Sequence, residues 1–180
     1  MKKPLVCFVL IAGIMASLSS CSSLFQSMIS KTYQMVIDEN APTDQNVTVT
    51  FLVTPSIVNT NQVSGVFVLK EWNNNDIEKK LYGAKNANAT DKTKLTVPAG
   101  NTSFTFDIYF FIEHGSGYDR ISTKKIELRY DLEPGKEYQI KGITKSLGLF
   151  KGYEFFVGIF DATDDKNIEL LKEWKVGEKT

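Results

Sequence analysis

Apolar and polar residues alternate with a period of two along most of the chain from residue 32 onward. Successive side chains of a strand point to opposite faces, so this period predicts strands with one face in a core. The clearest case is residues 103–112 (SFTFDIYFFI), in which every second side chain is Phe or Ile. A slip of one residue would turn that apolar row to water, and we therefore expect a fixed register.

Shorter stretches repeat the alternation and are separated by turn residues. They predict further strands at residues 32–37, 47–51, 63–69, 126–132, 138–140, 153–160 and 168–176. Pro55 is expected to end the strand before it. Residues 72–93 are rich in Asn and Lys and predict mainly loop, with a short helix at residues 76–81 that begins near Asp76. Residues 113–120 (EHGSGYDR) predict a glycine-rich loop.

Many short strands with no helical pattern between them predict an all-β domain of antiparallel strands. We expect a β-sandwich spanning residues 32–180, with a closed barrel as the alternative. A domain of this size buries a sufficient core without disulfides or a metal.

The N-terminus has a different pattern. Two lysines precede the apolar run at residues 5–16 (LVCFVLIAGIMA), and small residues then lead to Cys21. A helix over this run would span about 18 Å, short of the roughly 30 Å of a bilayer core, which predicts a cleaved signal peptide over residues 1–20. The string Leu18-Ser19-Ser20-Cys21 resembles the lipobox of bacterial lipoprotein precursors. The resemblance implies cleavage before Cys21, thioether lipidation of Cys21 and acylation of its amino group, for example by palmitate.

This resemblance predicts where the protein is located. Residues 21–31 become a lipidated linker, and several acyl chains give lasting membrane anchorage. Ser22 follows the cysteine where Asp would signal retention in Gram-negative bacteria, so the expected location is the outer membrane of the cell envelope. The alternative is an ordinary secretory signal that leaves Cys21 as a free thiol. Cleavage removes Cys7, and a single unpaired cysteine is unusual in an exported chain, which favours the lipoprotein interpretation.

Two strings further along the chain carry a second resemblance. LTVPAGNTSFTFDI contains the Pro98-Ala99-Gly100 turn, and IELRYDLEPGKEYQI contains the turn at residues 132–138. Both resemble turns of small bacterial lipoprotein and PEGA-like β-sandwich domains. The resemblance implies a prealbumin-like or immunoglobulin-like sandwich and supplies no catalytic residues. We expect Tyr138 to pack its ring and to hydrogen-bond its hydroxyl to the backbone.

Composition argues against two functional classes. Lys and Arg number 21, as do Asp and Glu, and no basic patch predicts nucleic acid as a partner. His114 is the single histidine, and it shares a glycine loop with Ser116, an arrangement unlike a catalytic triad. With no second His for zinc and no available cysteine nucleophile, we expect neither an enzyme nor a cofactor.

The segment DATDDKN, between the strands of the 153–175 hairpin, is a weak calcium motif. Asp161, Thr163 and Asp165 place oxygen ligands on alternate residues, as Ca²⁺ requires. However, Lys166 stands where such loops need Gly, and Lys172 stands where they need a bidentate Glu. A polar hairpin loop is therefore favoured, and calcium binding remains open.

The main hypothesis is a noncatalytic, lipid-anchored binding or structural module whose partner is an envelope protein or a polysaccharide. Loops 72–93 and 113–120 are the expected contact regions, with Trp72, Tyr82 and Tyr118 either anchoring a partner or packing locally. One alternative is a carrier with a Phe-lined cavity for a small apolar ligand. A less favoured alternative is an enzyme that uses carboxylates such as Asp107, Glu113 and Asp119. Asp107 is otherwise expected to pair across strands with a Lys or Thr.

Overall fold

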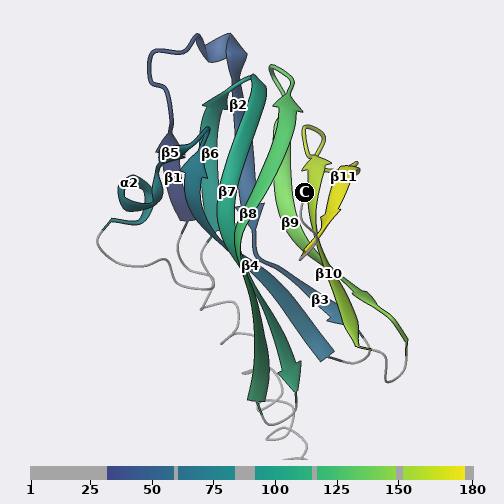
Figure 1. Ribbon diagram of the computed structural model, residues 1–180. Coiled ribbons are helices and arrows are strands. Elements are labelled where there is room, and N and C mark those ends of the chain that lie inside the picture. Colours follow the sequence, from purple (N-terminus) through teal and green to yellow (C-terminus); the bar gives the residue numbers. More distant parts are fainter. Residues whose placement is uncertain (1–31, 59–60, 84–91, 115–116, 149–151, 177–180) are drawn as a thin grey trace, which may run out of the picture. The chain divides into compact units, whose positions relative to one another are not determined.

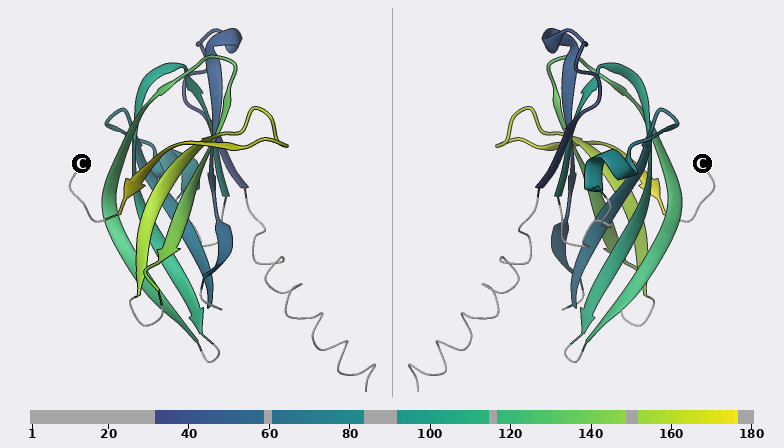
Figure 2. Two further views of the ribbon diagram at one scale, coloured as in Figure 1. Left: turned by 90° about the vertical axis from the view of Figure 1, so that its right-hand side faces the viewer. Right: turned by 90° about the vertical axis from the view of Figure 1, so that its left-hand side faces the viewer.

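The computed structural model describes residues 32–58, 61–83, 92–114, 117–148 and 152–176. These residues form two β-sheets that pack against each other around a common core (Figure 1; Figure 2). The predicted all-β sandwich is confirmed. The predicted signal peptide, the linker and Cys21 lie outside the described residues.

The larger sheet has six strands in the order β1-β6-β2-β9-β10-β11. Their bounds are β1 (Thr32–Val36), β6 (Lys92–Pro98), β2 (Asn46–Leu52), β9 (Glu137–Ser146), β10 (Tyr153–Asp161) and β11 (Glu169–Lys175). Two of its pairs, β1 with β6 and β2 with β9, are parallel, whereas only antiparallel pairing was expected. Long connections separate these strands in the chain, and such connections allow either direction of pairing.

The second sheet is fully antiparallel in the order β3-β4-β7-β8, with β5 also paired to β4. Its strands are β3 (Thr54–Val58), β4 (Asn61–Trp72), β5 (Asn75–Asp76), β7 (Gly100–His114) and β8 (Gly117–Leu132). The strand before Pro55 ends at Leu52, as expected, and Pro55 itself lies within the edge strand β3, a position proline tolerates. One expectation was wrong here. The predicted loop at 113–120 is mostly strand, because pairing continues to His114 and Gly117.

The core confirms the predicted register of β7. All five apolar residues on its inner face are between 0 and 4% exposed; they are Phe104, Phe106, Ile108, Phe110 and Ile112. Across the sandwich, the ring of Phe51 in β2 meets those of Phe67, Phe104 and Phe106 at centroid distances of 5.6, 5.5 and 5.9 Å. These edge-to-face contacts join the two sheets through aromatic packing.

A short helix, α2 (Glu78–Tyr82), lies beside β4, β5 and β1 (Figure 1; Figure 2, right). The expected short helix near Asp76 is confirmed, and the Oδ1 atom of Asp76 accepts the backbone N–H of Glu78 at 3.0 Å. The ring of Tyr82 packs edge-on against Tyr33 of β1 at 4.8 Å.

Tyr82 also completes the hydrogen bonding of a strand edge. β4 pairs with β3 over residues 61–65 and with β5 at residues 71–72, which leaves the backbone between them without a strand partner on that side. There the hydroxyl of Tyr82 accepts the N–H of Leu69 at 3.1 Å and lies 3.1 Å from Oγ1 of Thr93 in β6. One side chain therefore connects β4 of one sheet to β6 of the other and satisfies a buried amide.

The two turns singled out from the sequence have the expected form. Gly100 opens β7 with φ 105°, and Gly135 lies in the turn between β8 and β9 with φ 76°, both in the left-handed region that favours glycine. Tyr138 is 1% exposed, and its hydroxyl accepts the N–H of Glu133 at 3.0 Å. The prediction for Tyr138 is confirmed.

Candidate functional site

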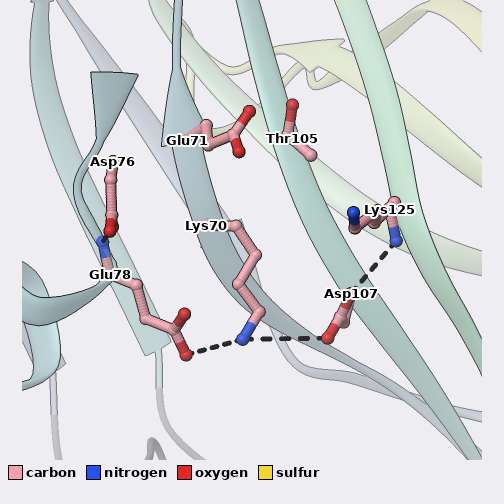
Figure 3. Close-up of a pocket in the computed structure, with 7 residues that line it drawn as sticks. All are labelled: Lys70, Glu71, Asp76, Glu78, Thr105, Asp107 and Lys125. Atoms are coloured by element: carbon pink, nitrogen blue, oxygen red, sulfur yellow. Dashed lines mark hydrogen bonds and ion pairs between the residues drawn. The ribbon is translucent and has the colours of Figure 1, made fainter. Parts of the chain in front are cut away.

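A hollow of about 570 Å³ lies on the outer face of the five-stranded sheet, over β4, β7 and β8 and beside β5 and α2 (Figure 3). We call it the outer hollow and define it by its lining. Four carboxylates, two ammonium groups and one hydroxyl line it, those of Glu71, Asp76, Glu78, Asp107, Lys70, Lys125 and Thr105. The lining therefore carries both signs of charge.

Two β-bulges shape this hollow. The pairing of β4 with β7 shifts between Leu69 and Glu71, so Lys70 has no opposite residue in β7. The pairing of β7 with β8 shifts across Asp107, and there Lys125 adopts φ 55°. Bulges re-aim side chains and bend the bulged strand, and here they lie on both sides of Asp107.

Asp107 forms the floor of the outer hollow. It is 8% exposed, its Oδ1 accepts the backbone N–H of Lys125 at 3.0 Å, and its Oδ2 is 3.8 Å from Nζ of Lys70. Nζ of Lys70 lies 2.6 Å from Oε1 of Glu78 (Figure 3). Burial opposes the charge of Lys70, but the hydrogen bond to Glu78 and the charges of Glu78 and Asp107 outweigh it, and the pKa of Lys70 is raised.

The side chains at the rim of the hollow make fewer hydrogen bonds and ion pairs than those at its floor. Among the described residues, no ion pair or hydrogen bond reaches the carboxylate of Glu71 or the ammonium group of Lys125. Glu71 and Thr105 are register partners on adjacent strands, and both line the hollow. The rim thus offers a free acceptor, a free donor and a hydroxyl.

Ion pairs already occupy the floor of the hollow. Lys70 occupies the space between the carboxylates of Glu78 and Asp107, where a cation would otherwise bind. The described residues contain no cluster of three or more His, Cys, Asp or Glu side chains with metal-binding geometry. The hydrogen-bonding groups left available to a ligand are those of Glu71, Thr105 and Lys125.

Of the carboxylates considered for catalysis, Asp107 and Asp119 lie on opposite faces of the sheet. Asp107 is on the outer face of β7 and pairs with Lys70 of the neighbouring strand, as expected for a cross-strand partner. Asp119 is paired with Ile112, whose side chain faces the core. Paired residues share a face, so Asp119 lies on the core-side face of the sheet and not on the outer face with Asp107. The side chains of Glu113 and His114 lie outside the described residues, as does Ser116.

The three aromatic residues expected at a partner surface differ in position. Tyr82 is 6% exposed and bonds within the domain, so of the two roles considered for it the structure shows local packing and not a surface anchor. Trp72 is half-buried against the core, and its Nε1 is buried without a hydrogen-bond partner among the described residues. Tyr118 belongs to β8 and not to a loop, and its side chain lies outside the described residues.

Two of the three residues in the weak calcium motif already bind other groups of the domain. Oδ1 of Asp161 accepts the N–H of Thr163 at 3.0 Å, and Oδ2 of Asp161 is 3.1 Å from Nζ of Lys136. The Thr163 hydroxyl accepts the N–H of Glu137 at 3.0 Å, whereas Asp165 is exposed. The hydrogen bonds from Thr163 and the charge of Lys136 lower the pKa of Asp161. A lysine ammonium therefore already neutralises this carboxylate.

No family model matches the chain, and neither the curated proteins nor the solved structures contain a significant match. The resemblance to PEGA-like domains accordingly stays a prediction. In the part of the chain that the structure describes, no helix has the length and apolar character needed to cross a membrane.

Proposed function

We propose that this chain is a lipid-anchored lipoprotein of a bacterial cell envelope, and that its β-sandwich binds a partner without catalysing a reaction. The string Leu18-Ser19-Ser20-Cys21, after a short apolar run and two lysines, is the observation that supports this most directly. Ser22 favours the outer membrane as the location.

The anchor would restrict which partners the domain meets. The segment from Cys21 to Thr32 spans at most about 40 Å when fully extended, so the domain stays close to the bilayer. An envelope protein or an envelope polysaccharide is the kind of partner found within that distance. The polar outer hollow gives such a partner a surface to bind.

A carrier of small apolar ligands is less well supported. The Phe residues that would line its cavity pack against one another, and Phe67 and Phe106 add a further contact at 5.3 Å. The outer hollow, in contrast, is lined by charged and hydroxyl side chains. An apolar ligand would lose the hydration of those groups without replacing it.

The test of the anchor is the intact mass of the protein extracted from membranes of a bacterial host. We expect the chain from Cys21 onward, increased by a diacylglyceryl group and one further acyl group. Cys21→Ser removes the acceptor sulfur and should abolish the increase. Cys7→Ser is the matched control, because Cys7 lies in the predicted signal peptide and its loss should leave the mature mass unchanged.

A mature chain without lipid that partitions into the aqueous phase would overturn the proposal. The same holds if Cys21→Ser retains the lipid mass, since the acceptor would then be another residue.

A further inference from the structure

We propose that the outer hollow binds a neutral, hydroxyl-rich ligand, a short segment of an oligosaccharide. This inference deepens the proposed function, because it assigns a site and a ligand class to the binding role.

The rim supplies the groups that sugar hydroxyls need. Each hydroxyl of a sugar both donates and accepts a hydrogen bond, so a site for it must offer both kinds of group. Glu71 offers only acceptors and Lys125 only donors, and both are free of partners among the described residues. Thr105, which offers both, lies between them (Figure 3).

Hydrogen bonds to charged groups are the strong ones. A neutral hydroxyl bound to a carboxylate or an ammonium group gains more than one bound to a neutral partner. The free carboxylate of Glu71 and the free ammonium of Lys125 can therefore each make a strong contact to a hydroxyl of the ligand.

The charges of the lining favour a neutral ligand over a charged one. Four carboxylates face two ammonium groups, which disfavours an anion such as a uronic acid or a phosphate. A cation meets Lys70, which already fills the space between Glu78 and Asp107. A neutral ligand leaves these ion pairs intact.

The backbone of the site is held in position before a ligand arrives. Asp107 accepts the backbone N–H of Lys125, and Glu78 holds the side chain of Lys70. Glu71 and Thr105 are on paired strands and not on a loop. A ligand therefore has to order only the side chains of Glu71 and Lys125, and the strands that carry them need no rearrangement.

The experiment is calorimetric titration of the full lipidated protein in a zwitterionic detergent without a sugar headgroup. The probes are neutral tetrasaccharides of glucose, mannose and xylose. Tetragalacturonic acid, a glucosamine tetramer and a tetralysine peptide serve as acidic and basic comparators. Glu71→Gln and Lys125→Met remove the two rim groups. Glu169→Gln, on β11 of the other sheet, is the matched control.

We expect at least one neutral tetrasaccharide to bind, with affinity that changes little between low and high salt because the ligand carries no charge. Glu71→Gln and Lys125→Met should each weaken it by about tenfold, the effect of losing a charged hydrogen bond. Glu169→Gln should leave the affinity unchanged.

Three results would overturn the inference. They are no binding of the neutral probes at millimolar concentration, binding of the charged probes alone, and binding that Glu71→Gln and Lys125→Met leave within twofold. Thermal melts confirm that each variant is folded. The mass measurement on Cys21 is independent, so failure of the site is distinguishable from failure of the anchor.

Discussion

The carboxylate of Asp107 holds the main chain of Lys125, whose N–H donates to Oδ1 of Asp107 at 3.0 Å. Lys125 has φ 55°, a conformation uncommon for a residue with a side chain. The bulge in β8 removes the ordinary strand partner of this amide, and the carboxylate replaces it. Asp107 therefore links the stability of the sheet to the shape of the outer hollow.

This bond predicts a graded response to substitution of Asp107. Asp107→Ala leaves the Lys125 amide without an acceptor and should reduce the free energy of unfolding by about 1–3 kcal/mol. Asp107→Asn keeps an oxygen acceptor and should reduce it by less. Urea unfolding at constant m-value measures both variants.

Asp131→Ala is the matched control, because Asp131 is an exposed residue of the same strand, β8. Its effect should stay within about 0.5 kcal/mol. Equal losses for Asp107→Ala and Asp131→Ala would contradict the assigned role of Asp107.

Removal of one hydroxyl tests how α2 is attached. Tyr82→Phe deletes the acceptor of the Leu69 N–H and the partner of Thr93 but keeps the ring. We expect a loss of about 1–3 kcal/mol in the free energy of unfolding, since a buried amide is left unsatisfied. Tyr109→Phe is the comparison, because Arg120 contacts the ring of Tyr109 and the ring is retained. If both variants lose the same stability, the hydroxyl of Tyr82 has no special role.

The same tyrosine predicts a dependence on alkaline pH. Burial raises the pKa of Tyr82 from its ordinary value of 10.0, so the unfolded chain releases this proton at lower pH than the folded chain. Stability is then unaffected below about pH 10 and falls as pH rises through the folded pKa. The decrease above about pH 10 should be smaller in Tyr82→Phe than in the wild type. An identical decrease in the two proteins would assign it to other groups, such as Lys70, whose pKa is also raised.

The sequence predicts the inner faces of the strands well, because burial imposes a period of two that single residues reveal. Phe104 to Ile112 follow that pattern, and the turn with Tyr138 carries recognisable Pro and Gly. The alternation of side chains does not indicate whether two strands pair parallel or antiparallel, so it did not predict the parallel pairing of β2 with β9.

The outer hollow was largely missed for a related reason. Asp107 stood out as a charge within an apolar strand, but Lys70, Glu71 and Lys125 look like ordinary surface residues. Two bulges bring them together around Asp107, and a bulge depends on the neighbouring strand as much as on the strand that contains it. A pattern within one strand therefore does not predict such a site.

Calcium should have little effect on this domain. Asp161 is paired with Lys136, and a Ca²⁺ ion would have to displace that ammonium group. We expect the midpoint of thermal unfolding to differ by less than about 1 °C between millimolar Ca²⁺ and a chelator. A rise of several degrees that disappears in Asp161→Asn would restore the calcium site.

A close approach of the two sheets gives the last prediction. Gly65 of β4 faces Gly142 of β9, and a Cβ added to Gly142 would lie 3.1 Å from Cα of Gly65 and 3.0 Å from Cε1 of Phe110. One of these neighbours is backbone and the other is a fully buried ring, so neither moves away easily. Gly142→Ala should therefore lower the free energy of unfolding by about 1–3 kcal/mol, although alanine normally favours folding over glycine. Gln139→Ala, in the same strand, is the control and should change it by less than about 0.5 kcal/mol. Urea unfolding measures the free energy of unfolding of both variants. A Gly142→Ala protein as stable as the wild type would mean that the sheets are less closely packed at this point.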